Sequence, residues 1–453
     1  MKRPQLLLVN PWIHDFAAYD LWARPLGLLV IASRLRRLGW EPRFVDCLDA
    51  DHSVMDSAKT RPHSHGRFVK TPIQKPAPLY GVPRTFSRYG ADPAVIEKDL
   101  LSISRPDAIL VTSIMTYWYP GVAETIRLLR KVFEGVPLLL GGIYASLLPH
   151  HALAHCGPDE VIVGPGESML PHALYRHTGF ASTSLEDEAM FEFSAALDLM
   201  RRVKFLPLIT SRGCPLSCAY CASRKIFPYF VKREVSAVIG EIKAAGDRYG
   251  ISDIALYDDA FLIDPPGHAL PLLEAAAVGL SGMRWHTPNG LHASAISPKV
   301  ASAMKKAGFE TIRIGVESVS DEFHNRTGGK TDRLSFLSAV TNLLDAGFSR
   351  EQIGAYLLVG LPGQSQGQIE DDVDLVLKAG AFPKLAEYSP IPGTLMWYEA
   401  VGSSPYPIET EPLFHNCTLL TAAEPGVDSK FLQGVRTRIS EYVMLTELQH
   451  IGK

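Results

Sequence analysis

Short apolar runs alternate with helical patterns along most of this chain, and that alternation constrains its fold more than any other feature. In the first 175 residues, strands are expected at 5–10, 43–47, 108–113, 137–140 and 160–164. Helical spacing of apolar residues occupies the intervals 26–38, 121–133 and 145–155. Strands joined through helices run parallel, so this half predicts a Rossmann-like, doubly wound parallel sheet in an α/β protein.

A second alternating series begins at residue 205. Its expected strands are 206–211, 253–257, 283–286, 311–316, 353–359 and 384–388. Helical patterns lie between them, for example at 235–249, 298–307, 334–346 and 368–379. Six strand–helix units favour a partial (β/α)6 barrel of the TIM type, in which chemistry is placed at the carboxyl ends of the strands.

These patterns divide the chain of 453 residues into four parts. We expect a Rossmann-like domain over 1–175, a linker over 176–204, a barrel over 205–400 and a C-terminal helical extension over 401–453, with a last helix near 435–450. Residues 51–105 are rich in Pro, His, Arg and Lys and show little periodicity. We interpret them as an insertion in the first domain.

Composition excludes several classes of protein. The net charge, 45 − 48 = −3, gives no sign of a nucleic-acid partner. No uninterrupted apolar stretch reaches the roughly 18–20 residues of a membrane span, and the N-terminal apolar run is too short for a signal peptide. We therefore expect a cytoplasmic protein. Six cysteines are too few for a disulfide scaffold of this length.

Three of the six cysteines, Cys214, Cys218 and Cys221, fall within eight residues, directly after the first strand of the barrel series. In a reducing compartment, such a cluster indicates a metal site rather than disulfides. A closed zinc site needs a fourth ligand, and no second Cys or His pair follows at the usual spacing. Three thiolates on a [4Fe–4S] cluster leave one iron open, which favours an iron–sulfur centre and keeps zinc as the alternative.

The spacing Cys-x-x-x-Cys-x-aromatic-Cys, with Tyr220 before Cys221, resembles the radical S-adenosylmethionine (SAM) superfamily. The resemblance covers residues 205–400. It implies that the three cysteines bind a [4Fe–4S] cluster whose open iron chelates SAM. One-electron reduction of the sulfonium then gives a 5′-deoxyadenosyl radical that abstracts hydrogen from the substrate.

The resemblance extends to the ends of later strands, where this superfamily places groups that contact SAM. Tyr220, within the cysteine motif, is one candidate contact. The others are Asp258 and Asp259 after the second strand, Glu317 and Ser318 after the fourth, and Gly360, Pro362 and Gly363 after the fifth. The usual Gly-Gly-Glu of the second strand is replaced here by Asp258 and Asp259. The contact expected there therefore comes from either carboxylate or from a backbone carbonyl, with an exposed acidic turn as the alternative.

The first half resembles the cobalamin-binding domains that are fused to one radical SAM subgroup. The shared marks are the Leu-Val-Asn-Pro opening at 8–11, Pro25-Leu26-Gly27, Gly141-Gly142 and Gly164-Pro165-Gly166-Glu167. The candidate cobalamin contacts are Asn10, Thr112, Ser113, Gly141, Gly142, Gly164, Gly166 and Glu167. Glycine turns at sheet edges also occur in doubly wound domains that bind no cobalamin, so that alternative stays open. The chain contains no Asp-x-His-x-x-Gly, and a histidine ligand on the lower face of cobalt is therefore not expected.

Three polar residues after the third barrel strand are candidates for substrate contact: His286, Asn289 and His292. A histidine at a strand end can orient a substrate or move a proton. A buried histidine that is simply satisfied by hydrogen bonds explains the same pattern.

The reaction expected from both resemblances is cobalamin-dependent methyl transfer to an unactivated carbon, with electrons from an external donor such as flavodoxin or ferredoxin. Three alternatives remain at this stage. One is a radical rearrangement, cyclisation or oxidation without methylation, and another is a non-catalytic iron–sulfur or cobalamin sensor. The third is a structural zinc protein. The sequence does not identify the substrate.

Overall fold

The computed structural model of this chain describes residues 3–52, 63, 66–180 and 194–451. The chain forms two compact units that meet in sequence between Lys204 and Phe205. Both units are built on parallel sheets flanked by helices, so the predicted α/β class is confirmed.

The first unit contains five parallel strands in the order β3-β1-β6-β7-β8. They are β1 (Gln5–Asn10), β3 (Glu41–Asp46), β6 (Ala108–Val111), β7 (Leu138–Leu140) and β8 (Glu160–Val161). The apolar run of β1 is continuous because both of its faces are buried. Leu7 and Val9 enter one core with helices α2 (Pro93–Leu101), α3 (Tyr119–Val132) and α5 (Pro149–Cys156). Leu6 and Leu8 enter the other with α1 (Leu26–Arg37) and α6 (Gly166–Thr178).

The predicted insertion at 51–105 contains more regular structure than its composition indicates. Helix α2 within it connects β3 to β6 and belongs to the doubly wound core. Strands β2 (Ile13–Asp15), β4 (Lys70–Pro72) and β5 (Ser87–Tyr89) form a small antiparallel sheet in the order β2-β5-β4. Residues 53–62 and 64–65 of the segment, like 181–193 of the predicted linker, lie outside the described residues.

The single helix predicted at 145–155 is wrong, because two helices occupy this range. Helix α4 (Ile143–Leu147) ends at Leu148, whose φ of −133° is not helical, and α5 begins at Pro149. Proline disfavours the helical conformation of the residue before it and fits the first position of a new helix.

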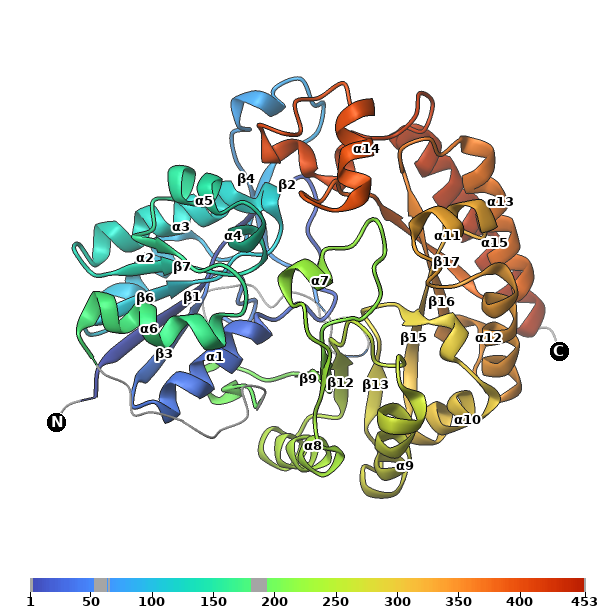
Figure 1. The fold of residues 1–453 in the computed structure, drawn as a ribbon, viewed down its shortest axis with the longest axis horizontal. Coiled ribbons are helices and arrows are strands. Elements are labelled where there is room, and N and C mark those ends of the chain that lie inside the picture. The colour runs from blue at the N-terminus through green and yellow to red at the C-terminus, as the bar shows by residue number, and fades with distance from the viewer. Residues whose placement is uncertain (1–2, 53–62, 64–65, 181–193, 452–453) are drawn as a thin grey trace. The chain divides into compact units, whose positions relative to one another are not determined.

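The second unit contains six parallel strands in the order β17-β16-β15-β13-β12-β9. The strands are β9 (Leu206–Leu208), β12 (Asp253–Leu256), β13 (Arg284–His286), β15 (Phe309–Glu317), β16 (Ile353–Val359) and β17 (Phe382–Glu387). Short strand β14 (Leu291–His292) also pairs with β15. Figure 1 shows the strands as a curved sheet with helices along its outer side: α8 (Val235–Tyr249), α9 (Leu270–Gly279), α10 (Pro298–Ala307), α12 (Arg333–Asp345) and α13 (Gln366–Ala379).

Several elements of this unit are absent from the strand–helix pattern predicted from sequence. The first strand bends after Leu208, and β10 (Ser211–Arg212) pairs antiparallel with β11 (Val231–Lys232). Short helices α7 (Ser223–Ile226), α11 (Asp321–Thr327) and α14 (Leu395–Ser403) follow strand ends. The last helix, α15 (Ser429–Ile451), contacts β17 and α13, and Arg436 on it forms an ion pair with Glu387.

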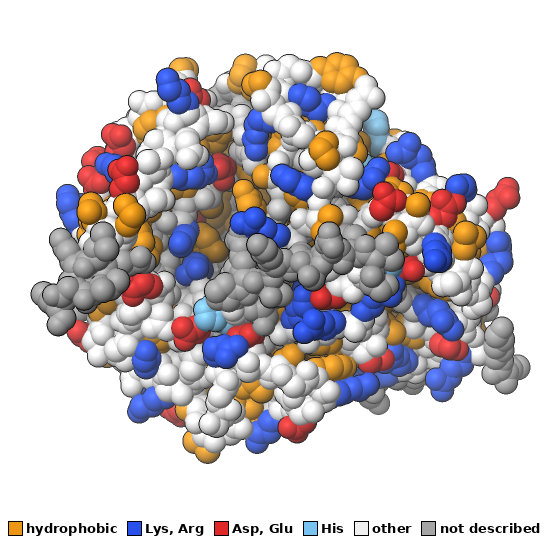
Figure 2. Space-filling view, turned by 180° about the vertical axis from the view of Figure 1, so that it is seen from behind, with side chains coloured by type: hydrophobic (Ala, Val, Ile, Leu, Met, Phe, Trp, Pro, Cys, Tyr) orange, Lys and Arg blue, Asp and Glu red, His pale blue; other side chains and the backbone are white. Residues whose placement is uncertain are grey.

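Figure 2 shows Lys and Arg side chains interspersed with Asp and Glu over one face of the molecule. This distribution agrees with the nearly balanced charge of the sequence. Among the helices of the described residues, none combines the length and the apolar character that a membrane span requires.

Candidate radical SAM and B12-binding sites

The three clustered cysteines lie on the loop between β10 and α7, and contacts distant in sequence hold this loop. The amide of Ala219 donates to the carbonyl of Thr327 at the end of α11, over 3.0 Å, and its carbonyl accepts from Met396 at the start of α14, over 2.9 Å. Cys214 and Cys218 are half-buried, Cys221 is exposed, and all three are free thiols. The loop is thus fixed in place with its sulfur atoms available to a ligand.

The number of donors on this loop bears on which centre it fits. The loop offers three free cysteine thiols. A closed tetrahedral zinc site takes four protein ligands. A [4Fe–4S] cluster held by three cysteines keeps one iron open, which fits a set of three.

Tyr220 supports the cysteine loop by contacts with α11 and with Cys218. Its ring stacks on Phe323 of α11, with 6.3 Å between the ring centroids, and its hydroxyl hydrogen-bonds to Cys218. Burial, with Glu317 and Cys218 nearby, raises the pKa of the Tyr220 hydroxyl far above its usual range, which keeps it a hydrogen-bond donor. Burial also raises the pKa of the Cys214 and Cys218 thiols, so ligation must displace their protons.

Asp258 holds the backbone that leads into the cysteine loop. Its carboxylate accepts hydrogen bonds from the amides and hydroxyls of both Thr210 and Ser211, at 2.5 to 2.9 Å. Burial raises the pKa of Asp258 to about 6 despite these four donors. The exposed neighbour, Asp259, lies near Arg212 and Ser223. Of the two candidate carboxylates, Asp259 is therefore the one that is exposed to a ligand.

Glu317 ends β15 in a conformation that is unusual for a side chain of its kind. Its φ is +66°, and a register shift in the pairing of β15 with β16 falls between Gly315 and Glu317. Such strain is commonly stored where a functional side chain must be aimed. The carboxylate is buried and lies 2.9 Å from the ammonium of Lys330. Lys330 also lies close enough to Cys218 and Cys221 for their charges to raise its pKa.

Lys330 is a site residue that the sequence analysis missed. It follows Gly328 and Gly329, which both have positive φ and turn the chain back from α11 toward the end of β15. No periodicity distinguishes this lysine from a surface one. Gly315 lies against the same contact, since a Cβ there would lie 2.5 Å from the Lys330 ammonium and would force it to shift.

Ser318 and the turn after β16 are fixed by polar side chains rather than left open. Ser318 donates its hydroxyl to Asp372 of α13 over 3.1 Å. The side-chain carbonyl of Gln364 accepts from the amide of Gly360 over 2.9 Å. Pro362 is buried, and a Cβ at Gly360 would lie 2.8 Å from Leu420, so the C-terminal extension occupies that space. Gly363 remains exposed, with φ +76° and open space around it.

The three candidate substrate residues differ in what they offer. His286 is fully buried, and its two ring nitrogens lie 3.0 Å from Thr311 and from Asp253, which agrees with a satisfied structural histidine. Asn289 is exposed and donates to the carbonyl of Tyr257 over 3.0 Å. His292 is buried with Nδ1 unpartnered among the described residues, and burial with Lys330 nearby lowers its pKa to about 4.

In the first unit, several predicted cobalamin contacts come together at the carboxyl edge of the sheet. The Ser113 hydroxyl, after β6, donates to the carbonyl of Gly141 after β7, over 2.7 Å. Gly142 has φ +99°, and a Cβ there would lie 2.2 Å from the Ser113 carbonyl. The amide of Gly164, after β8, donates to Ser146 over 3.0 Å.

The remaining positions complete this edge. Thr112 continues β6, and Gly166 and Glu167 begin α6, where a Cβ at Gly166 would meet Ile31. Gly141 and Gly164 leave the edge without bulky side chains, and no neighbour fills the space around Gly164. Because these glycines carry no side chain, a flat macrocycle could come close to the backbone and hydroxyl groups along this edge.

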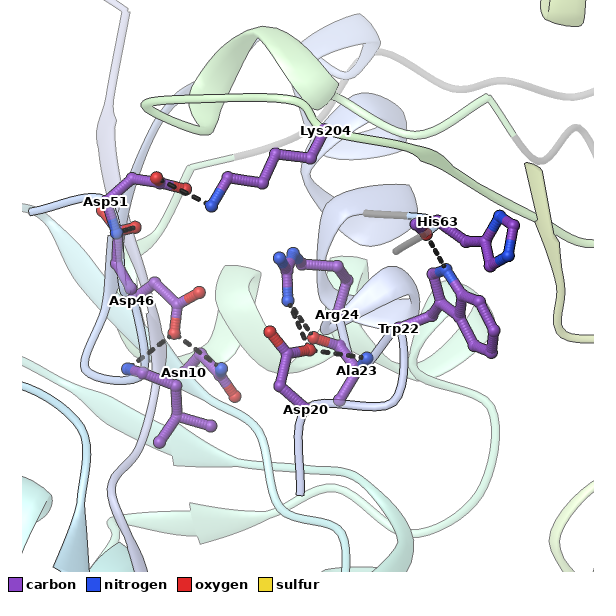
Figure 3. A network of polar contacts seen from close by, with 11 residues as sticks. Asn10, Asp20, Trp22, Ala23, Arg24, Asp46, Asp51, His63 and Lys204 are labelled. Atoms are coloured by element: carbon purple, nitrogen blue, oxygen red, sulfur yellow. Dashed lines mark hydrogen bonds and ion pairs between the residues drawn. The ribbon is translucent and has the colours of Figure 1, made fainter. Parts of the chain in front are cut away.

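Asn10 lies at the same edge, but it faces a polar network on the side of β3. Figure 3 shows its amide pointing to Asp46, to which it donates over 2.7 Å. Burial raises the pKa of Asp46 to about 6. In the same view, Arg24 pairs with Asp20 and Lys204 pairs with Asp51. The side-chain amide of Asn10 is therefore already engaged by Asp46.

Comparisons with known proteins agree with both halves of this description. The model for the radical SAM superfamily matches residues 208–376, and that for the B12 binding domain matches residues 91–174. The chain is 25% identical over 280 residues to bacteriochlorophyllide d C-12(1)-methyltransferase of Chlorobaculum tepidum, covering 58% of this chain and 60% of that protein. It is 29% identical over 374 residues to cytidylyl-2-hydroxyethylphosphonate methyltransferase of Streptomyces wedmorensis, covering 69% of this chain and 65% of that protein.

A solved structure shows the same fold. The radical SAM methyltransferase TsrM from Kitasatospora setae, with cobalamin and a [4Fe–4S] cluster bound, superposes with a TM-score of 0.65. The superposition has 16% identity and covers 90% of this chain and 76% of that one. A radical SAM domain implies a [4Fe–4S] cluster and SAM, and a B12-binding domain implies cobalamin. The chain therefore contains a radical SAM domain preceded by a B12-binding domain.

Proposed function

We propose that this protein is a cobalamin-dependent radical SAM methyltransferase that transfers a methyl group to an unactivated carbon of its substrate. The observation that carries the proposal is the presence, in one chain, of a three-cysteine loop on a partial barrel and a glycine-edged doubly wound sheet. The two curated relatives compared above are methyltransferases, although the matches span 60% and 65% of their lengths.

The cofactors supply the difficult chemistry: a reduced cluster cleaves SAM to generate the radical, and cobalamin carries the methyl group. The role of the chain is to bind and orient them. In this proposal Cys214, Cys218 and Cys221 bind the cluster. SAM is contacted by Glu317, by Asp259 and by the exposed turn at Gly363, and Lys330 aims the Glu317 carboxylate. Gly141, Gly164 and Ser113 form the edge that receives cobalamin.

Reduction of the cluster requires a partner, since nothing in the proposed site generates low-potential electrons. We propose an external one-electron donor such as flavodoxin or ferredoxin. A reducing cytoplasm suits this chemistry, because the cysteine ligands must remain thiolates rather than disulfides.

The test is anaerobic purification from cells supplied with cobalamin, followed by counting of iron, sulfide and cobalt. Reductant and SAM are then added, and 5′-deoxyadenosine is measured. Methyl-labelled SAM and an anaerobic extract of the source cells show whether a metabolite gains the labelled methyl group. We expect four irons per chain, cobalt, and both products.

Alanine variants of Cys214, Cys218 and Cys221 should each lose the cluster and SAM cleavage, while Cys417→Ala, a matched change at a half-buried cysteine elsewhere, should keep both. Zinc without iron would refute the assignment. Cleavage of SAM with an unmethylated product would instead establish a rearrangement, cyclisation or oxidation. Bound cofactors without cleavage would establish a sensor.

A further inference from the structure

Three side chains on adjacent strands of the second unit, Arg313 of β15, Tyr356 of β16 and Lys384 of β17, form a surface that we call the cationic shelf. Strand residues alternate between faces. On the helix side of the sheet, Val359 of β16 and Leu385 of β17 pack with Ile369 of α13 and Leu432 of α15. Tyr356 and Lys384 alternate with these residues, and Arg313 shares the face of Tyr356 and Lys384 through its pairing with Gly354. All three side chains therefore lie on the opposite, inner face of the curved sheet.

The sheet makes room for the Arg313 side chain. Arg313 is paired with Gly354 in the register of β15 and β16. A Cβ at Gly354 would lie 2.8 Å from the Arg313 Nη1 and 3.0 Å from its Cδ. The guanidinium thus lies close over the backbone of β16 at Gly354, where a Cβ would force the arginine side chain to shift.

Tyr356 fixes the orientation of that guanidinium. Its hydroxyl accepts a hydrogen bond from Arg313 and donates one to the carbonyl of Pro288 over 2.9 Å. Tyr356 is also paired with Lys384 in the register of β16 and β17. The two cationic groups consequently flank one tyrosine on three neighbouring strands.

Among the described residues, no Asp or Glu forms an ion pair with Arg313 or Lys384. Glu317, whose charge acts on Tyr356, is itself paired with Lys330. Glu387, three positions after Lys384, is paired with Arg436. Desolvation and the charge of Arg313 lower the pKa of Lys384, although part of its side chain stays exposed. Burial likewise lowers the pKa of Arg313. Repulsion between these two positive groups costs free energy, and a bound anion would offset that cost.

We infer that the cationic shelf binds an anionic group of the substrate, a carboxylate or a phosphate, on the inner face of the sheet. The planar guanidinium can donate hydrogen bonds to two oxygens of such a group at once, and the ammonium adds a second positive charge. The shelf would thereby select anionic substrates and hold one end of them. This inference rests on the proposed function only in calling the bound molecule a substrate.

The test uses the full-length holoenzyme and three probes of similar size: phenyl phosphate, benzoate and the neutral benzyl alcohol. Binding is measured by ligand-observed NMR in the wild type, in Arg313→Gln and Lys384→Gln, and in the control Lys378→Gln. Lys378 lies exposed on α13, outside the sheet, so its variant removes one positive charge without touching the shelf.

We expect at least one anion to bind the wild type and the Lys378→Gln control equally, and benzyl alcohol not to bind. Each shelf variant should weaken anion binding about tenfold or more. Comparison of the two anions decides between a phosphate and a carboxylate. Lys384→Gln, at a partly exposed position, preserves the test should Arg313→Gln fail to fold.

Unchanged anion affinity in the folded shelf variants, or no anion binding to the wild type, overturns the inference. SAM cleavage is measured in the same wild-type preparation. Anion binding without SAM cleavage refutes the proposed function and leaves the shelf standing, whereas cleavage without anion binding refutes the shelf alone.

Discussion

The carboxylate of Glu317 lies 2.9 Å from the ammonium of Lys330, and both side chains are largely shielded from solvent beside the cysteine loop. The pair joins the strained end of β15 to the turn that follows α11. Burial opposes charge on Lys330, but Glu317, Cys218 and Cys221 outweigh it and raise the pKa of Lys330. The ammonium is thus retained where the cluster and SAM are proposed to bind.

Replacing Lys330 by Met tests this relationship. The substitution keeps the length of the side chain but leaves the buried Glu317 carboxylate unpaired, which should cost roughly 3 kcal/mol of unfolding free energy. We expect weaker SAM binding, measured by equilibrium dialysis, and loss of 5′-deoxyadenosine formation. Lys299→Met removes an exposed lysine whose ion pair with Glu274 spans 3.7 Å, and it should change neither quantity. Normal SAM affinity in Lys330→Met would show that the pair is only structural.

Asp258→Asn tests whether the four donors on Asp258 organise the cysteine loop. An amide offers only one acceptor oxygen, so the backbone amides of Thr210 and Ser211 cannot both keep their partners. Leaving such a buried donor unsatisfied should cost about 1–3 kcal/mol and lower the iron content per chain. Urea unfolding of the apoprotein and iron analysis check this, with Asp247→Asn at an exposed position of α8 as the control. Full iron content in Asp258→Asn would refute the role.

Asp372 gives the second unit a predictable dependence on pH. Burial raises its pKa to about 6, and one of its oxygens is buried without a partner in the described residues. Because the folded-state pKa lies above the ordinary value of 3.8, the native state binds more protons between these values. Stability is therefore highest below about pH 4 for this group and falls as the pH rises through 6, by roughly 3 kcal/mol.

The variant Asp372→Asn should remove this contribution, so that its unfolding free energy changes less between pH 4 and 7 than that of the wild type. Asp374→Asn is the matched control, because Asp374 lies two residues away on α13 with a side chain 46% exposed. Chemical denaturation across this pH range provides the measurement. Equal slopes for the wild type and Asp372→Asn would contradict the assignment.

These sites also show how far sequence alone could predict the molecule. The strands of both sheets were predicted to within a few residues, because runs buried on both faces, such as β1, are continuous in sequence. The cysteine loop and the end of β15 could be found because each is a local motif. Lys330 could not be predicted, since its role depends on a chain reversal at two glycines.

The same limit explains the histidines and the cationic shelf. His286 was a candidate for substrate contact, yet its ring nitrogens are satisfied by Asp253 and Thr311, which come from two other strands. Arg313 and Lys384 are 71 positions apart, and only the register of β15, β16 and β17 places them near one tyrosine. Contacts set by strand register leave no trace in the local periodicity of a sequence.

A last prediction concerns the edge of the first unit. Gly142→Ala should destabilise the first unit for two reasons. The backbone φ of +99° is unfavourable for alanine, and the new Cβ would lie 2.2 Å from the Ser113 carbonyl. The control Gly179→Ala has a similar positive φ of +71° but open space, so it should cost only about 1 kcal/mol. We expect Gly142→Ala to lose several times that amount and to retain less cobalt per chain, as measured by thermal unfolding and metal analysis. Equal losses in both variants would mean that backbone conformation alone, and not the close contact between Gly142 and Ser113, shapes this edge.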